Sequence, residues 1–163
     1  MGIVRVLVAL VLALPLAAPA AAQAHSGAGS ATDYRIAGLT VRPAGLPVHV
    51  DALGGDDRLR LRWDGPGELV VLGYAGEPYL RLTPDGAFEN RRSPSVAPNA
   101  SRYGQVVTQD VLPGQAPAWR RIADAPVAVW HDHRSHWMSR SRPPAVRRDP
   151  GREHVVQRWR IPL

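Results

Sequence analysis

The chain has 163 residues, with 20 basic and 14 acidic side chains, and a formal net charge of +6. Every basic residue is arginine, and the arginines are spread among Asp and Glu rather than clustered, so the charge does not indicate a nucleic-acid-binding module. Because the chain contains no cysteine, no disulfide framework can hold the fold, which must depend on buried apolar area or on a bound ligand.

The first 24 residues predict a secretory signal peptide. Arg5 precedes an apolar run over 6–14, Pro15 ends that run, and Ala22-Gln23-Ala24 supplies an A-x-A cleavage site. Cleavage there would make His25 the first residue of a secreted chain in or beyond the cell envelope, although neighbouring alanines offer other sites. An uncleaved N-terminal membrane anchor is the less favoured alternative, because a span needs about 20 uninterrupted apolar residues.

The remainder is long enough for one domain. Residues 25–33 are mostly Gly, Ser and Ala without periodicity, which predicts a flexible leader. The folded domain is expected over residues 34–163. We expect no transmembrane helix in the mature chain, because no second stretch is long and apolar enough. The frequent prolines and glycines also disfavour a long amphipathic helix.

Short apolar runs separated by Pro and Gly predict several strands. Residues 58–63 alternate strictly and place Leu59, Leu61 and Trp63 on one face, and the turn residues after them favour a hairpin with the next strand. A second hairpin is expected around the turn at 83–86. The strands are expected over 34–41, 48–53, 58–63, 68–74, 78–82, 87–89, 127–131 and 154–161.

This succession of short strands predicts an all-β fold, an antiparallel β-sandwich of the Ig-like or cupredoxin-like kind. A βαβ arrangement is disfavoured because no crossover helix is visible. Residues 90–117 lack a clear pattern and predict a long loop. The strand pattern runs to the last residue, so we expect a domain that is cut short at its C-terminus.

The densest group of candidate metal ligands lies at 131–138. If the strand that begins at Val127 continues to His133, then His131 and His133 share one face, with Cβ atoms roughly 6.5–7 Å apart. A turn after His133 would bring His136, and then Met138, to the same ion. Imidazole with thioether suits copper, and three imidazoles suit zinc equally well, so copper is the first candidate and zinc the alternative.

Two further residues bear on this hypothesis. Asp132 would lie on the opposite strand face, where it could orient an imidazole. His25 could chelate a metal with its free amine and its ring if cleavage exposes it. The alternative is that the histidines are packed core residues between Trp130 and Trp137, with Arg134 stacked on a Trp and paired with Asp132.

A charged cluster of Glu77 and Glu89 with Arg91 and Arg92 is also conceivable; the simpler interpretation is a glycine-dependent turn beside a loop held by Arg–carboxylate bonds. Signatures of catalysis are missing: the sequence has no G-x-S-x-G elbow, H-E-x-x-H motif, P-loop or dinucleotide fingerprint. We therefore expect no enzyme activity.

Three segments carry a resemblance to known proteins: VLGYAGEPYL at 71–80, ENRRSP at 89–94 and WHDHRSHWM at 130–138. Together they resemble a family of uncharacterised secreted or membrane-anchored actinobacterial proteins, over nearly all of the mature chain. The resemblance implies no reaction. It implies a further β segment and a C-terminal membrane helix, both lacking here, so the chain resembles a truncated or free-standing version.

A second, fainter similarity is to periplasmic copper-binding β-sandwich proteins of the copper-resistance type, whose mature chains begin with a ligand histidine, as His25 would. Their Asp-Gly-His stretch is absent, since His131-Asp132-His133 has no Gly. The expected function is an extracytoplasmic binding module for copper or another transition metal. The alternative is a non-catalytic structural or interaction domain that contacts envelope components or another protein without metal.

Overall fold

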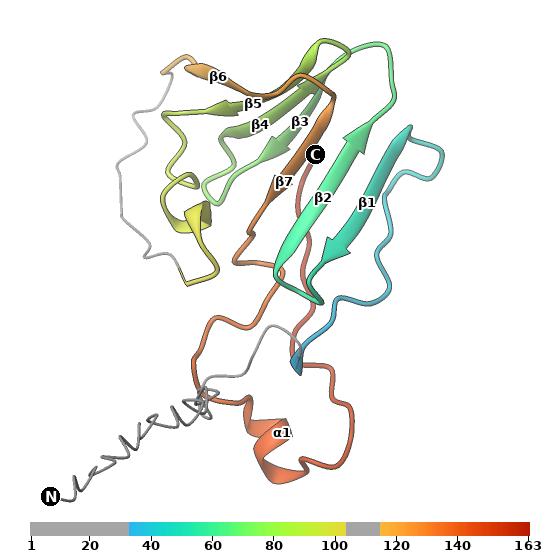
Figure 1. The fold of residues 1–163 in the computed structure, drawn as a ribbon, viewed down its shortest axis with the longest axis vertical. Coiled ribbons are helices and arrows are strands. Elements are labelled where there is room, and N and C mark those ends of the chain that lie inside the picture. Colours follow the sequence, from blue (N-terminus) through green and yellow to red (C-terminus); the bar gives the residue numbers. More distant parts are fainter. Residues whose placement is uncertain (1–32, 104–114) are drawn as a thin grey trace, which may run out of the picture.

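The computed structural model describes residues 33–103 and 115–163, and their strands form two antiparallel sheets (Figure 1). The three-stranded sheet has the order β1-β2-β7 and the four-stranded sheet the order β3-β4-β5-β6. The strands are β1 (Val48–Leu53), β2 (Arg58–Trp63), β3 (Leu69–Leu72), β4 (Pro78–Thr83), β5 (Gly86–Asn90), β6 (Trp119–Ala123) and β7 (Val127–Trp130). Two short helices, η2 (Pro98–Ala100) and α1 (Pro144–Arg148), lie in the connections.

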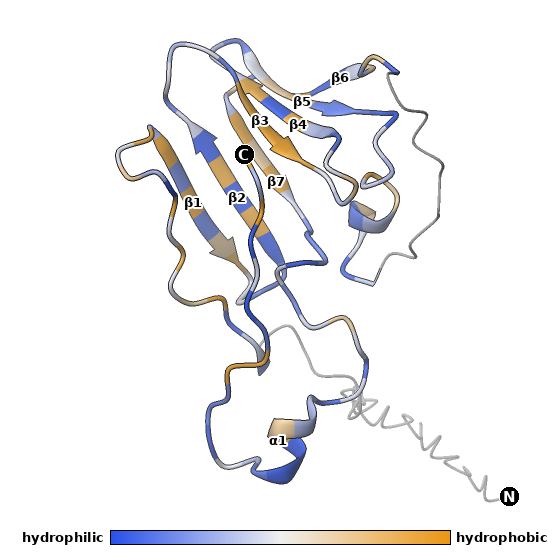
Figure 2. Ribbon diagram, turned by 180° about the vertical axis from the view of Figure 1, so that it is seen from behind, coloured by the Kyte–Doolittle hydropathy of each residue, from blue (hydrophilic) through white to orange (hydrophobic). Residues whose placement is uncertain are grey.

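The core lies between the two sheets, as the strand patterns predict. In β2, Leu59, Leu61 and Trp63 are buried while the intervening arginines are exposed, and Figure 2 shows the same alternation along the ribbon. From the other sheet, Val71 and Leu82 are fully buried against them. The expected all-β sandwich is thus confirmed.

The predicted hairpin between 58–63 and 68–74 is wrong. β2 pairs with β1 and β7, whereas β3 pairs only with β4, so the chain changes sheets between them. The Trp63 indole folds back over this connection and donates a hydrogen bond from Nε1 to the Gly67 carbonyl at 2.9 Å. Its ring leaves no room for a Cβ at Gly65, where one would lie 2.0 Å from the indole. The turn residues therefore serve a crossover between the sheets.

The second hairpin, around 83–86, is confirmed: β4 and β5 pair with Thr83 opposite Gly86. The strands expected at 48–53 and 127–131 correspond to β1 and β7. The expected strand at 34–41 is not formed, and Gly38 interrupts its extended backbone with a φ of 68°. β6 lies beyond the expected loop and was not predicted.

Residues 154–161 are extended but belong to no sheet. Their segment runs back along the sandwich beside β7, and its main-chain link to a strand is the hydrogen bond from Leu72 N to the Pro162 carbonyl at 3.0 Å (Figures 1 and 2). Trp159 and Ile161 pack against the core. The alternation of polar and apolar residues over 154–161 thus identified the side chains that pack against the core. It did not identify a strand, because the segment forms no hydrogen-bonded ladder with a neighbour among the described residues.

Among the described residues, no helix has the length and apolar character needed to cross a bilayer. The expected signal peptide, the leader up to residue 32 and the candidate ligand His25 lie outside the described residues.

Candidate functional site

The histidine-containing segment follows β7 at one end of the sandwich. The strand ends at Trp130, and the chain then turns, with Ser135 donating both its N–H and its hydroxyl to the Asp132 carbonyl at 2.8 and 2.7 Å. The prediction that the strand reaches His133, with His131 and His133 on one strand face, is therefore wrong. The reason is the Asp132 side chain, which bonds its own loop and so favours a turn.

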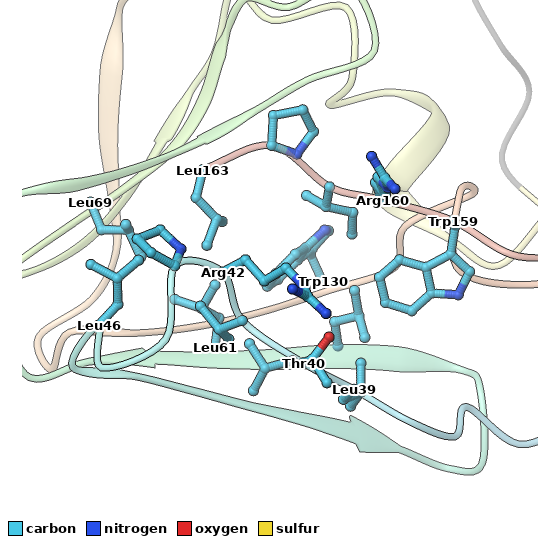
Figure 3. Close-up of a pocket in the computed structure, with 16 residues that line it drawn as sticks. Leu39, Thr40, Arg42, Leu46, Leu61, Leu69, Trp130, Trp159, Arg160 and Leu163 are labelled. Atoms are coloured by element: carbon cyan, nitrogen blue, oxygen red, sulfur yellow. The ribbon is translucent and has the colours of Figure 1, made fainter.

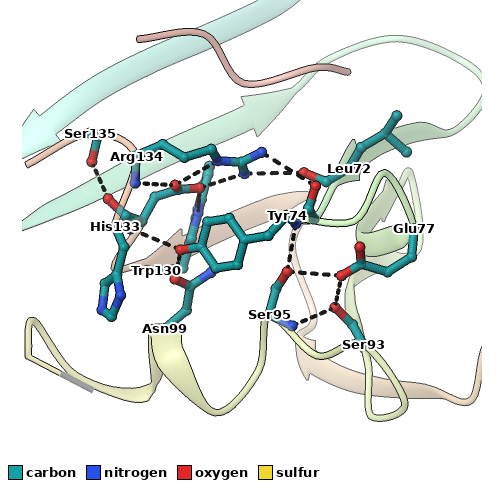
Figure 4. Close-up of polar contacts among 12 residues, drawn as sticks. Leu72, Tyr74, Glu77, Ser93, Ser95, Asn99, Trp130, His133, Arg134 and Ser135 are labelled. Atoms are coloured by element: carbon teal, nitrogen blue, oxygen red, sulfur yellow. Dashed lines mark hydrogen bonds and ion pairs between the residues drawn. The ribbon is translucent and has the colours of Figure 1, made fainter. Parts of the chain in front are cut away.

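Asp132 is fully buried and joins the end of β7 to the loop that follows it. Its carboxylate accepts hydrogen bonds from Trp130 Nε1 at 3.0 Å and from Arg134 Nε and Nη2 at 2.9 and 2.8 Å (Figure 4). The pairing of Arg134 with Asp132 is the predicted one, but the guanidinium stacks on Tyr74 rather than on a Trp. None of these hydrogen bonds joins the Asp132 carboxylate to a histidine ring. The suggested role of Asp132 in orienting an imidazole is therefore not observed.

Arg134 and Tyr74 connect this loop to the connection between β3 and β4. Arg134 Nη2 donates to the Leu72 carbonyl at 3.1 Å, and its guanidinium lies 4.9 Å from the centre of the Tyr74 ring. The Tyr74 hydroxyl accepts the His133 N–H at 2.9 Å and donates to Asn99 Oδ1. Burial and the charge of Asp132 raise the pKa of Tyr74 to about 12, so the hydroxyl stays protonated.

Glu77 connects the same turn to the loop after β5. Its Oε1 accepts hydrogen bonds from the hydroxyls of Ser93 and Ser95, the latter at 2.8 Å, and its Oε2 accepts the Ala75 N–H at 2.9 Å. Burial alone would raise the pKa of Glu77, but these serine hydrogen bonds hold it below its ordinary value. The less favoured alternative, a charged cluster of Glu77 with the two arginines, is thus not formed. Serine hydroxyls take the place of the guanidinium groups.

The three segments that carry the family resemblance therefore meet in one polar cluster at this end of the sandwich. Figure 4 shows Tyr74 and Glu77 from the first, Ser93 from the second, and Trp130, His133 and Arg134 from the third. Sequence reasoning treated these segments separately. Their convergence brings together groups that are up to 62 positions apart, as for the Arg134 guanidinium and the Leu72 carbonyl.

Each of the three predicted histidine ligands in the 131–138 segment is oriented by a backbone carbonyl. His131 Nδ1 lies 2.8 Å from the Asp57 carbonyl, His133 Nε2 lies 3.1 Å from that of Ser101, and His136 Nδ1 lies 3.3 Å from that of Asp56. Since a carbonyl only accepts, these nitrogens carry the protons, and in the neutral form of each ring the second nitrogen has the lone pair. Hydrogen bonds of this kind orient metal-binding imidazoles in proteins.

His133 and His136 lie close together, with ring centroids 5.5 Å apart. His136 is 2% exposed, and its Nε2 has no hydrogen-bond partner. In the described ranges, no three His, Asp or Glu side chains come together as a metal-binding group, so the structure brings together a pair of the predicted ligands rather than the full set. Met138 is partly buried further along the same segment.

A buried ion pair lies next to His136. Arg102 and Asp56 make two hydrogen bonds of 2.8 Å each, and both side chains are almost fully buried. Burial, followed by the nearby charge of Arg102, lowers the pKa of His136. His136 is therefore neutral at pH 7 and presents an Nε2 lone pair.

Several residues of this site were missed by sequence reasoning. Asp56 and Arg102 lie in turns and Asn99 lies in the short helix η2, where no periodicity distinguishes a structural polar residue from a surface one. Three of the four unpartnered buried side-chain nitrogens among the described residues belong to this end of the sandwich: Asn99 Nδ2, Arg102 Nε and His136 Nε2.

No protein-family description, curated protein or solved structure was found to match the chain. The function of the site is therefore inferred from its own geometry.

Proposed function

We propose that the protein is a non-catalytic, extracytoplasmic binding module that holds one transition-metal ion, copper in the first instance, at the His133–His136 pair. The observation that carries this proposal is the unpartnered, buried Nε2 of His136 beside the His133 ring. A buried nitrogen with a free lone pair costs free energy unless a ligand or a donor satisfies it.

The spacing of the rings supports a shared ion. An imidazole nitrogen lies about 2 Å from a bound metal, so two rings at tetrahedral angles have centroids about 5 Å apart. The observed 5.5 Å lies close to that value. The lowered pKa of His136 also favours binding, because the ring does not have to lose a proton first.

Two imidazoles leave coordination positions open. His131 and Met138 lie in the same segment and are our candidates for these positions, together with His25 if it becomes the mature N-terminus. Thioether and imidazole ligands together favour copper, whereas imidazoles alone also suit zinc. The charge of Arg102 opposes a cation, but its bidentate pairing with Asp56 offsets that charge locally.

Metal analysis and thermal melts with and without Cu(II) or Zn(II) test the proposal. An ion at about 100 times its dissociation constant should stabilise the fold by about 2.7 kcal/mol. The His133→Gln and His136→Gln variants should lose this shift, whereas His49→Gln, an exposed histidine of β1, should keep it. No shift, or an equal shift in the His133 and His136 variants, would end the metal proposal. N-terminal sequencing of secreted protein establishes whether His25 is the first residue of the mature chain.

A second candidate is a structural or interaction domain of the envelope in which the loop only packs. The observation that favours it is the number of internal partners of the cluster, in which Asp132, Arg134 and Glu77 are all hydrogen-bonded within the protein. It predicts that metal changes neither the melting temperature nor the His133 and His136 environments in NMR spectra.

A further inference from the structure

A cavity of about 790 Å³ opens between the two sheets, away from the histidine pair. Its floor is the inner face of the β1-β2-β7 sheet, with Val50, Leu59, Leu61 and Trp130 (Figure 3). Its other walls are the segments 39–46 and 159–163, together with Leu69 of β3. A space of this size, lined mostly by apolar groups, is typical of small-molecule sites.

The charges on this cavity have one sign. Arg42 and Arg160 belong to the lining, and no Asp or Glu does. Neither arginine forms an ion pair with a carboxylate of the described chain, although most arginines of the strands do. In Figure 3, Arg42 extends among the apolar side chains toward Trp130 and Thr40, so its guanidinium lies over the apolar space.

We infer that this cavity binds the chain of a single amphiphile whose anionic head, a carboxylate or a phosphate, pairs with Arg42 and Arg160. An apolar interior favours the alkyl chain, and two cations without carboxylate partners favour the anion. The concave shape suits one extracted molecule rather than a bilayer surface, which needs a protruding apolar patch. This site is separate from the proposed metal pair, and Trp130 lies between the two, since its indole lines the cavity and donates to Asp132.

Calorimetric titration of the whole secreted protein with decanoate, 1-decanol and decyltrimethylammonium tests this inference. Decanoate should bind most tightly and the ammonium compound most weakly. Dodecanoate should bind more tightly than decanoate, by about fourfold for each added CH₂. Titration with phosphatidylglycerol vesicles is a separate measurement. It distinguishes binding of a free amphiphile from binding to a membrane surface.

Three variants make the test specific. Arg42→Gln with Arg160→Gln should weaken decanoate about tenfold and leave 1-decanol unchanged. The matched control is Arg147→Gln with Arg148→Gln, exposed arginines of α1 that do not line the cavity, and it should change neither affinity. Thr40→Trp, at an exposed lining position, should block both ligands while circular dichroism shows the same fold.

The inference is overturned if no amphiphile binds saturably, or if the loss of both lining arginines leaves the preference for decanoate intact. It also fails if the protein associates only with vesicles. A change of oligomeric state in the Thr40→Trp variant, measured by light scattering, would instead identify the occupant as a second copy of the chain and overturn it as well.

Discussion

The guanidinium of Arg134 lies 4.9 Å from the centre of the Tyr74 ring while it forms an ion pair with Asp132 at 2.8 Å. One side chain thereby joins the loop after β7, a strand of the three-stranded sheet, to the connection between β3 and β4 of the four-stranded sheet. Burial would lower the pKa of Arg134, but the hydrogen bonds and charge of Asp132 raise it, so the guanidinium stays charged. The histidine loop is consequently fixed to the sandwich on both sides.

The Asp132→Asn substitution should therefore destabilise the fold by about 3 kcal/mol, because it leaves the Arg134 charge without its partner inside the protein. Urea unfolding monitored by tryptophan fluorescence measures the change. Arg35→Gln is the matched control, since it breaks an ion pair whose side chains are 66% and 83% exposed, and it should cost less than about 1 kcal/mol. Equal losses in both variants would contradict a structural role for the buried pair.

Replacing Gly73 should disturb the Glu77 cluster through steric overlap alone. A Cβ at this position would lie 1.9 Å from Glu77 Oε1 and 2.4 Å from Ser95 Oγ. The Gly73→Ala variant should lose about 2 kcal/mol or more of unfolding free energy, because the carboxylate and its serine partners must move. Gly67→Ala, where a Cβ meets no atom within 4 Å, should change stability by less than about 0.5 kcal/mol in the same assay.

The fold class could be predicted from the sequence because alternation reports burial directly. The strict pattern at 58–63 identified the buried face of β2, and the turn at 83–86 identified the hairpin of β4 and β5. Which strands pair was less predictable. A Gly-Pro-Gly turn can join two paired strands of one sheet, and it can equally connect a strand of one sheet to a strand of the other. The Trp63 ring, packed over Gly65, decided the outcome here.

The site was predictable in part. The histidine-rich segment is conspicuous in composition, whereas the tyrosine, glutamate and serines that support it lie in turns distant in the sequence. Asp132 was expected to face away from the ligands and instead ends the strand by bonding its own loop. Which nitrogen of His136 stays without a partner depends on the Asp56 carbonyl, and no local sequence pattern reports that contact.

Removing the Tyr74 hydroxyl should loosen the histidine loop. Tyr74→Phe leaves the His133 N–H and Asn99 Oδ1 without their partner and should cost about 1–3 kcal/mol of stability. If the metal proposal holds, the dissociation constant for Cu(II) should also rise by about tenfold, since the substitution frees the His133 backbone. Calorimetric titration with Cu(II) measures this. The control is Tyr34→Phe, whose hydroxyl bonds no described residue, and an equal weakening there would refute the positional role of Tyr74.

Stability should fall as the pH drops below about 6.5, and His136 should account for part of the loss. The unfolded chain takes up a proton on this ring near its ordinary pKa of about 6.5, whereas burial and the charge of Arg102 lower the pKa of the folded state. Between those two values the unfolded state binds more protons, so the free energy of unfolding decreases as pH falls. The contribution is complete above pH 6.5 and is lost progressively toward the folded-state pKa.

Urea unfolding of the wild type and of His136→Gln from pH 7.5 to pH 5 measures this contribution as the difference between the two curves. Staying above pH 5 keeps Glu77 out of the comparison, because its lowered pKa makes its own contribution disappear only below about 4.5. The difference should shrink with falling pH, with a slope of at most about 1.4 kcal/mol per pH unit for one proton. His133→Gln serves as the control at the partly exposed neighbouring ring. A difference that stays constant over this range would mean that His136 takes up its proton equally well in the folded protein, and that its buried Nε2 can reach an acceptor or a water molecule.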